Sequence, residues 1–208
     1  MRRLRRHRSR GGLHGGGDGK EINMFTQTQG QALLDLAHRA IEQGLQSTPS
    51  RSTLPNPDPA FEAAHGVFVT LKHNGVLRGC IGSIASSEPL YQEVQHAARS
   101  AAFRDPRFPP VTAEEWPAMT LEVSVLSAIE AVADPEDIEL GRHGVIVQKD
   151  GRSGVFLPQV ARETGWDRET FLSTLCSEKA GLPSDAWTDP NTGLFVFTSE
   201  VFASEERQ

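Results

Sequence analysis

The residues with the clearest chemical potential lie in the hexapeptide Leu77-Arg78-Gly79-Cys80-Ile81-Gly82, which closes a strand-like run. Cysteine reacts as the thiolate, and a nearby guanidinium or row of peptide N–H groups lowers its pKa. Gly79 and Gly82 free the backbone and let another group approach closely. The pattern predicts a site with Cys80 as nucleophile or thiol acceptor and Arg78 pairing an anionic ligand. In the alternative, Cys80 is a small buried hydrophobe and Arg78 bridges to an acid.

Asp105 and Arg107 are a second pair of candidate ligand-binding residues. They flank Pro106 in segment 105–110, whose three prolines exclude a helix. If both side chains face Cys80, they add an acid and a second cation to the site. Otherwise, Asp105 caps a turn and Arg107 forms an ordinary ion pair.

His143 is the best placed of the seven histidines for proton transfer, because glycines expose it and the ordinary pKa of histidine lies near neutrality. A surface loop histidine is the simpler alternative. Gln159, after Leu157-Pro158, would hydrogen-bond a substrate amide or carbonyl, or cap the following helix. No Ser–His–Asp order, phosphate-binding glycine loop or Glu-x-x-His pair occurs, and neither cysteine has zinc-ligand spacing. We therefore expect neither a metal nor a cofactor.

Composition indicates a globular protein of one domain. The chain has 208 residues, of which 38% are hydrophobic and 23% charged. It has no apolar run of the ~18 residues that a membrane span requires, so we expect no membrane partner. Two cysteines without a secretory segment favour the reducing cytoplasm. Cys176 lies on an apolar helical face and is expected in the core.

Charge is distributed unevenly along the chain. Residues 1–20 carry seven Lys or Arg against one acid, whereas the rest carries 14 basic and 26 acidic residues. An acidic body argues against a broad phosphate-binding face, so a nucleic-acid partner is not expected. We interpret residues 1–23 as a disordered Arg/Gly-rich extension and residues 24–208 as the folded domain.

Periodicity predicts helices over residues 29–44, 90–103, 159–165 and 167–180. Strands are predicted over residues 66–72, from Val76 into the hexapeptide, and over 119–126, 145–149, 153–157 and 194–197. Asn74-Gly75 and Asp150-Gly151 provide two hairpin turns. Hairpins and helices alternate without a strand–helix–parallel-strand rhythm. The predicted fold is therefore α+β: a two-lobed single domain with mostly antiparallel sheet flanked by helices.

Seven ordered blocks between residues 29 and 202 resemble the AMMECR1 domain family, and in bacteria component A of the AmmeMemoRadiSam system. They are residues 66–71, 77–82, 89–90, 105–108, 122–126, 157–160 and 179–182. The resemblance implies a two-lobed α+β fold and a cytosolic protein. It also implies two partners, a Memo-type protein and a radical S-adenosylmethionine protein, but no settled activity.

Two functions are therefore open. In the first, the chain is a component of an AmmeMemoRadiSam-type modification system, and a Cys/Arg-lined cleft binds or modifies a small molecule or macromolecule. In the second, it is a non-catalytic binding or scaffold module for a protein partner, and Cys80 is structural.

Overall fold

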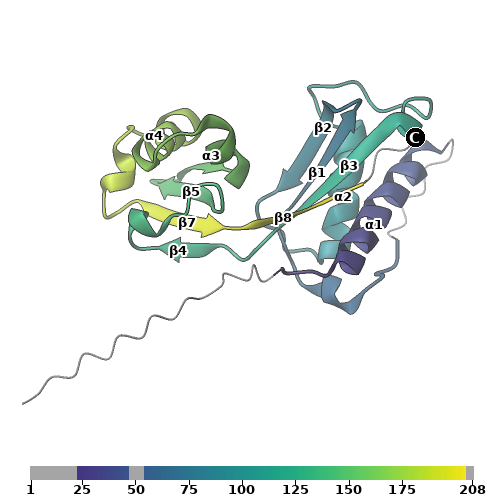
Figure 1. Ribbon diagram of the computed structural model, residues 1–208, viewed down its shortest axis with the longest axis horizontal. Helices are drawn as coiled ribbons and strands as arrows, with labels where there is room; N and C mark the ends of the chain where they lie inside the picture. The colour runs from purple at the N-terminus through teal and green to yellow at the C-terminus, as the bar shows by residue number, and fades with distance from the viewer. Residues whose placement is uncertain (1–22, 47–53, 205–208) are drawn as a thin grey trace, which may run out of the picture.

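Two four-stranded antiparallel sheets organise the computed structural model, which describes residues 23–46 and 54–204 (Figure 1). The first sheet has the order β2-β1-β3-β8, formed by β2 (Val76–Ser83), β1 (Val67–His73), β3 (Met119–Leu126) and β8 (Ser199–Ala203). The second has the order β4-β7-β5-β6, formed by β4 (Glu130–Val132), β7 (Gly193–Phe197), β5 (Gly144–Lys149) and β6 (Arg152–Phe156). Each sheet is the centre of one lobe of a single α+β domain, which confirms the predicted fold class.

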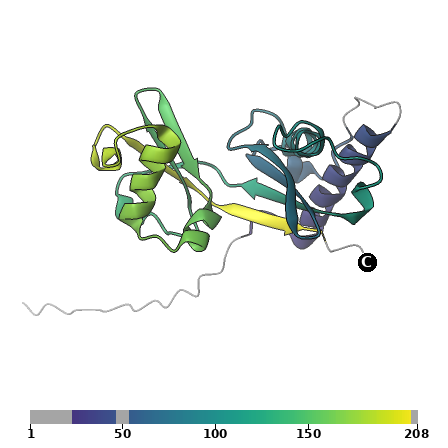
Figure 2. The same ribbon diagram turned by 90° about the horizontal axis from the view of Figure 1, so that it is seen from above.

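The two lobes have separate helices. Helices α1 (Gln27–Leu45) and α2 (Leu90–Phe103) cover one face of the first sheet (Figure 1). Helices α3 (Pro158–Thr164) and α4 (Arg168–Thr174) and the π-helix η4 (Leu175–Ala180) belong to the second lobe. The described 3₁₀ turns are η1 (Pro59–Glu62), η2 (Trp116–Ala118), η3 (Pro135–Asp137) and η5 (Ala186–Thr188). Seen from above, the lobes lie side by side (Figure 2).

Local sequence explains where α1 begins and how closely α2 packs. The Thr26 hydroxyl accepts the Gln29 N–H while the Gln29 side chain accepts the Thr26 N–H, a complete capping box. In α2, four alanines lie on the buried face, so the sheet approaches the helix backbone closely. A Cβ on Gly79 would lie 2.2 Å from the Ala101 carbonyl oxygen, so this contact requires glycine.

Both predicted hairpin turns are present. Asn74 and Gly75 have φ values of 51° and 75°, and Asp150 and Gly151 have 50° and 75°. Two successive residues with positive φ are the signature of the type I′ turn, for which Asn-Gly and Asp-Gly are favoured. These turns join β1 to β2 and β5 to β6.

Two antiparallel strand pairs connect the lobes. β3 pairs with β8 in the first lobe, and β4 pairs with β7 in the second. Between these pairs, Ser127 N–H donates to the Thr198 carbonyl at 3.0 Å, and Thr198 N–H donates to Ser127 Oγ at 2.9 Å. The first lobe thus comprises described residues up to 126 together with 199–204, and the second comprises residues 127–198.

The structure corrects two sequence predictions, the set of strands and one helix. Strands β4 and β8 were not predicted, because β4 has no fully buried residue and β8 buries Phe202 alone, so neither has a strong alternating pattern. The single helix predicted over residues 167–180 is instead α4 followed by η4. The extension predicted over residues 1–23 stays a prediction, because residues 1–22 lie outside the described residues.

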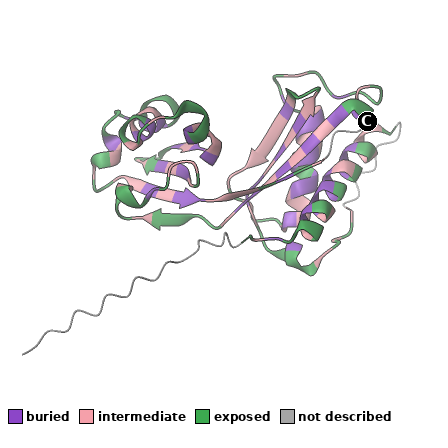
Figure 3. Cartoon of the chain, viewed as in Figure 1, coloured by how far each residue is buried: buried purple, intermediate pink, exposed green. Residues whose placement is uncertain are grey.

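Each lobe has its own hydrophobic core (Figure 3). The first core lies between the first sheet and helices α1 and α2, and the second lies between the second sheet and the helices of that lobe. Cys176 is fully buried in the second core, as predicted, and burial raises the pKa of its thiol. Among the helices in the described part of the chain, none is long and apolar enough to cross a bilayer.

Candidate functional site

The helix-free face of the first sheet displays the thiol of Cys80. Register places Cys80, Thr70, Glu122 and Ala203 in one row across the four strands, and Gly82, Phe68, Ser124 and Val201 in the next. Side chains alternate along a strand, and Val67, Val69 and Leu71 point into the helix-covered core. The two rows therefore lie on the opposite face, which we call the open face.

A β-bulge in the first hairpin sets this register. Lys72 pairs with Leu77, but Leu71 pairs with Gly79, so Arg78 is the extra residue of β2. Downstream of the bulge, Cys80 lies directly opposite Thr70. The Thr70 hydroxyl donates to Cys80 Sγ at 3.3 Å.

Asp105 and Arg107 bind both backbone groups of Cys80. Asp105 Oδ2 accepts the Cys80 N–H at 2.9 Å, and Arg107 Nη2 donates to the Cys80 carbonyl at 3.1 Å. Arg107 also donates to both oxygens of Asp105, through Nη2 at 2.7 Å and Nε at 3.0 Å. β2 is an edge strand, so this pair occupies the main-chain groups that another strand would use.

Burial differs sharply within this pair. The Asp105 side chain is 1% exposed, whereas that of Arg107 is 54% exposed. Hydrogen bonds from the Arg107 guanidinium hold the pKa of Asp105 well below its usual range, and the bond to Asp105 raises the pKa of Arg107. Asp105 is thus a structural anchor that is ionised at neutral pH, while Arg107 remains accessible beside Cys80.

Arg78 holds a neighbouring loop. Its guanidinium donates to the Pro109 carbonyl at 2.8 Å and to Glu115 Oε2 at 3.2 Å, and its side chain is only 12% exposed. The pKa of Glu115 is lowered by the Thr112 N–H and further by Arg78. Arg78 therefore bridges to an acid, as in the alternative interpretation of the hexapeptide. Its pairing with an anionic ligand stays a prediction.

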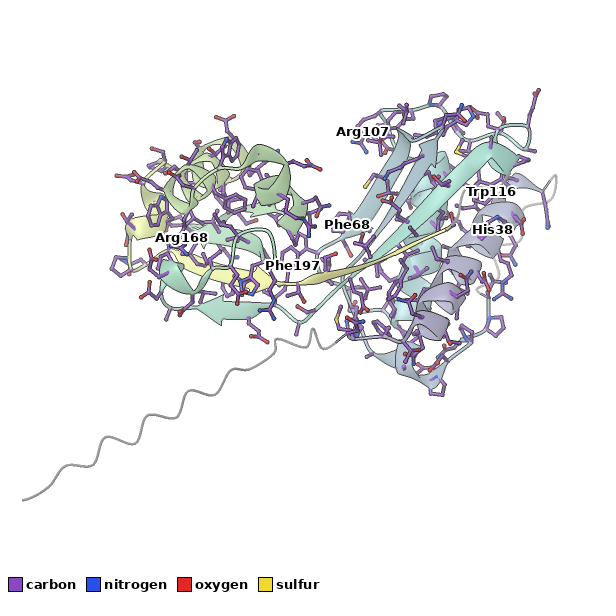
Figure 4. The ribbon with its side chains drawn as sticks, in the orientation of Figure 1. His38, Phe68, Arg107, Trp116, Arg168 and Phe197 are labelled. Atoms are coloured by element: carbon purple, nitrogen blue, oxygen red, sulfur yellow. The ribbon has the colours of Figure 1, made fainter. Side chains whose placement is uncertain are left out.

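The two glycines of the hexapeptide serve different contacts. Gly79 faces α2, where it permits the close approach to Ala101. Gly82 lies on the open face beneath Phe68, whose ring atom Cδ1 would be 2.8 Å from an added Cβ. Figure 4 shows Phe68 and Arg107 on the side of the first lobe turned toward the second lobe, with His38 and Trp116 on the other side.

His143 and Gln159 lie in the second lobe. His143 Nδ1 accepts the Glu139 N–H at 3.1 Å, and the residue immediately precedes β5. Gln159 is in the first turn of α3, which begins without a side-chain cap, so Gln159 is not the predicted capping residue. The structure therefore brings Arg78, Cys80, Asp105 and Arg107 together and places His143 and Gln159 on a different lobe.

Three side chains of the open face were missed by sequence reasoning. Thr70 contacts the thiol, Phe68 covers Gly82, and Glu122 forms an ion pair with Lys72. The alternation of residues 66–72 and 119–126 could have assigned them to one face. Only the bulge determines which of them lies beside Cys80.

The charged side chains on the open face and beside it form ion pairs. Lys72 pairs with Glu122, Arg107 with Asp105 and Arg78 with Glu115. In residues 23–46 and 54–204, no group of three or more His, Cys, Asp or Glu side chains is arranged to hold a metal ion. The arrangement is suited to contact a molecule through an aromatic ring, hydroxyls, a thiol and one accessible guanidinium.

Similar proteins are found over nearly the whole described chain. A family model for AMMECR1 matches residues 34–202. A protein from Thermococcus kodakarensis is 44% identical over 188 residues, covering 85% of this chain and 90% of that protein. A protein from Methanopyrus kandleri is 44% identical over 191 residues, with 88% and 91% of the two chains covered.

The structural comparison agrees with this match. The crystal structure of an uncharacterized protein from Pyrococcus horikoshii superimposes with a TM-score of 0.78 at 40% sequence identity. The similarity covers 89% of this chain and 96% of that one. Together, the family model, the identity and the shared fold show that this chain belongs to the AMMECR1 family.

Proposed function

We propose that this chain is the substrate-holding component of an AmmeMemoRadiSam-type modification system, and that the open face of the first sheet binds the molecule to be modified. Membership of the AMMECR1 family supports a role in such a system, and the surroundings of Cys80 support the open face as the binding site. A cytoplasmic location and two protein partners, a Memo-type protein and a radical S-adenosylmethionine protein, belong to the same proposal.

One observation carries the proposal: Cys80 is half-buried on the helix-free face of the sheet, and Asp105 and Arg107 hold its backbone N–H and carbonyl groups in place. Because these side chains occupy the outer edge of β2 at Cys80, a partner strand cannot pair there. A bound molecule must instead approach through the open face, where it meets Phe68, Thr70 and the thiol. Fixed groups bind at a lower entropic cost than mobile ones.

A scaffold module for a protein partner is the second candidate. The surroundings of the thiol favour this candidate. The hydrogen-bond partner of Cys80 Sγ among the described residues is the Thr70 hydroxyl, which is not a base that could activate the thiol. His143, the residue predicted to move protons, has its Nδ1 engaged by Glu139 on the other lobe. In this case, the open face binds a partner and Cys80 contributes packing without reacting.

A modifying partner must reach the molecule held on the open face, so binding to the purified Memo-type and radical S-adenosylmethionine proteins tests the site. Ser124→Trp places a large ring in the same row as Phe68 and Val201, and we expect it to abolish binding by obstructing the open face. His96→Trp is the matched control, because His96 is an exposed residue of α2, the helix that covers the opposite face. Unchanged binding by Ser124→Trp would show that the open face is not the site.

Cys80→Ser separates the two candidates. Loss of modification activity with retained binding and folding supports a substrate-holding role in which the thiol contacts the substrate. Activity and binding equal to those of the wild type support the scaffold module. Circular dichroism and thermal unfolding of each variant identify any loss that is due to folding.

A further inference from the structure

A second candidate site lies where the lobes meet. An open cavity of about 760 Å³ is bounded by Met24, Glu200 and Val201 of the first lobe and by Gly141, Arg142 and Arg162 of the second. None of the residues that hold Cys80 lines it. Its volume falls within the ~300–1,000 Å³ typical of small-molecule sites.

Two guanidinium groups from separate segments line this cavity. Arg162 extends from α3, and Arg142 comes from the turn before β5. Arg162 is exposed and forms no hydrogen bond or ion pair with any residue of 23–46 or 54–204. Arg142 uses Nη1 alone on both oxygens of Glu139, at 3.0 Å each, which leaves its Nη2 and Nε for another acceptor.

Gly141 lies where the two arginine-bearing segments meet at the cavity. Gly141 has a φ of 84°, a left-handed conformation that other residues adopt only with strain. A Cβ at this position would lie 3.2 Å from Arg162 Cγ, so the aliphatic stem of Arg162 packs directly against the turn that carries Arg142. The turn and the stem of Arg162 are therefore in contact, and both arginines line the cavity.

Another part of the cavity wall provides hydroxyl groups and a carboxylate that is already engaged. Thr198 and Ser199 line the cavity at the junction of β7 and β8. Glu200 Oε2 accepts the N–H groups of Met24 and Phe25 at 3.0 and 3.2 Å. The wall therefore presents hydrogen-bonding hydroxyls, with a negative charge that two backbone donors partly satisfy.

The net charge of the chain limits the number of negative charges on the ligand. Guanidinium groups bind carboxylate and phosphate oxygens with two parallel hydrogen bonds. A polyanion would bring many charges against a chain whose residues 21–208 contain 26 acidic and 14 basic groups. Apolar contacts from Met24, Leu140 and Val201 suit a carbon skeleton beside the oxyanion.

We propose that the cavity between the lobes binds a small organic molecule with one or two oxyanion groups, held by the guanidinium groups of Arg142 and Arg162 and by the hydroxyls of Thr198 and Ser199. This inference goes beyond the substrate-holding function of the open face and does not depend on it. Because the ligand contacts both lobes, its binding also stabilises their relative placement.

Titration of the ¹⁵N-labelled chain at constant ionic strength tests the proposal, with succinate, malate and inorganic phosphate as the probes. The amide signals of Gly141 and Ser199 report on the lining contributed by the second and the first lobe, respectively. We expect both signals to shift with one common dissociation constant, and Arg162→Gln to weaken binding about tenfold or more through loss of charge-assisted hydrogen bonds. Arg104→Gln, an exposed arginine at the end of α2, is the matched control and should bind as the wild type does.

The probes distinguish the source of the oxyanion: saturation by the carboxylates alone identifies an organic acid, and saturation by phosphate as well identifies a phosphorylated metabolite. Absence of saturation by all three probes up to about 10 mM overturns the proposal. Equal weakening by Arg104→Gln and Arg162→Gln also overturns it, because the effect would then be one of net charge. The rate of Cys80 alkylation, measured on the same samples, reports separately on the open face.

Discussion

The Thr70 hydroxyl lies 3.3 Å from Cys80 Sγ because the bulge at Arg78 moves the register of the first hairpin by one residue. Without the bulge, the pairing of His73 with Val76 would continue regularly and bring Thr70 opposite Gly79. The thiol would then face the helices. The bulge is therefore what turns Cys80 to the open face.

Removing the Thr70 hydroxyl should slow the chemistry of Cys80. The hydroxyl donates a hydrogen bond to sulfur and so holds Sγ in place on the open face, where the reagent approaches. In a Cys176→Ala background, Thr70→Val should lower the rate of iodoacetamide modification about 2- to 10-fold, the range expected for one neutral hydrogen bond. Thr70→Ser, which retains the hydroxyl, should react at nearly the wild-type rate. Equal rates for all three proteins would show that the contact has no influence on the thiol.

Asp105→Asn should destabilise the fold by about 2–3 kcal/mol, because it removes a charged acceptor from the Cys80 N–H and from Arg107. Urea unfolding at neutral pH measures this difference. Arg104→Gln, an exposed change nearby in sequence, should alter stability by less than about 0.5 kcal/mol. Similar unfolding midpoints for both variants would contradict the anchoring role.

The same carboxylate should contribute a pH dependence. The folded-state pKa of Asp105 is depressed, so its contribution to stability is complete above the ordinary pKa of aspartate and is lost as the pH falls through the folded value. We expect the stability difference between wild type and Asp105→Asn to be constant from neutral pH to mildly acidic pH and to shrink only under strongly acidic conditions. A difference that shrinks between pH 8 and about pH 6 would contradict this assignment.

Gly79→Ala should be among the most destabilising single substitutions in the hairpin. Its Cβ would lie 2.2 Å from the Ala101 carbonyl oxygen, which belongs to a packed helix backbone that cannot easily move. We expect a loss of about 2–4 kcal/mol, measured by thermal or urea unfolding. Gly75→Ala is the comparison: nothing lies within 4 Å of its Cβ, and only the positive φ of 75° opposes it, at a cost of about 1–2 kcal/mol. The reverse order of stability would contradict the close strand–helix contact.

The fold followed from local patterns where those patterns were strong. The Asn74-Gly75 and Asp150-Gly151 turns, the alternation of residues 119–126 and the stripe of α1 each have a local cause, and the structure contains them all. β8 was not predictable in this way, because only Phe202 is buried and its partner, β3, lies far away in sequence. Long-range pairing of this kind leaves little trace in a single short segment.

The arrangement of the candidate residues was predicted only in part, for a related reason. Composition and spacing identified Cys80, Asp105 and Arg107, but the contact of Asp105 with the Cys80 N–H spans 25 residues and depends on how the 105–110 segment folds back. His143 is separated from Cys80 because the two residues belong to different lobes. The sequence around each residue gives no sign of which lobe it belongs to. Spacing along the chain therefore identified the groups but not their placement.

The most direct test of the central claim is the rate of iodoacetamide modification of Cys80 in folded Cys176→Ala protein, measured without and with the purified Memo-type protein that we propose as a partner. The open-face assignment predicts modification without unfolding, and protection of Cys80 once the complex has formed. The contrary result would be a thiol that reacts only after the protein unfolds, or one that reacts equally fast inside and outside the complex.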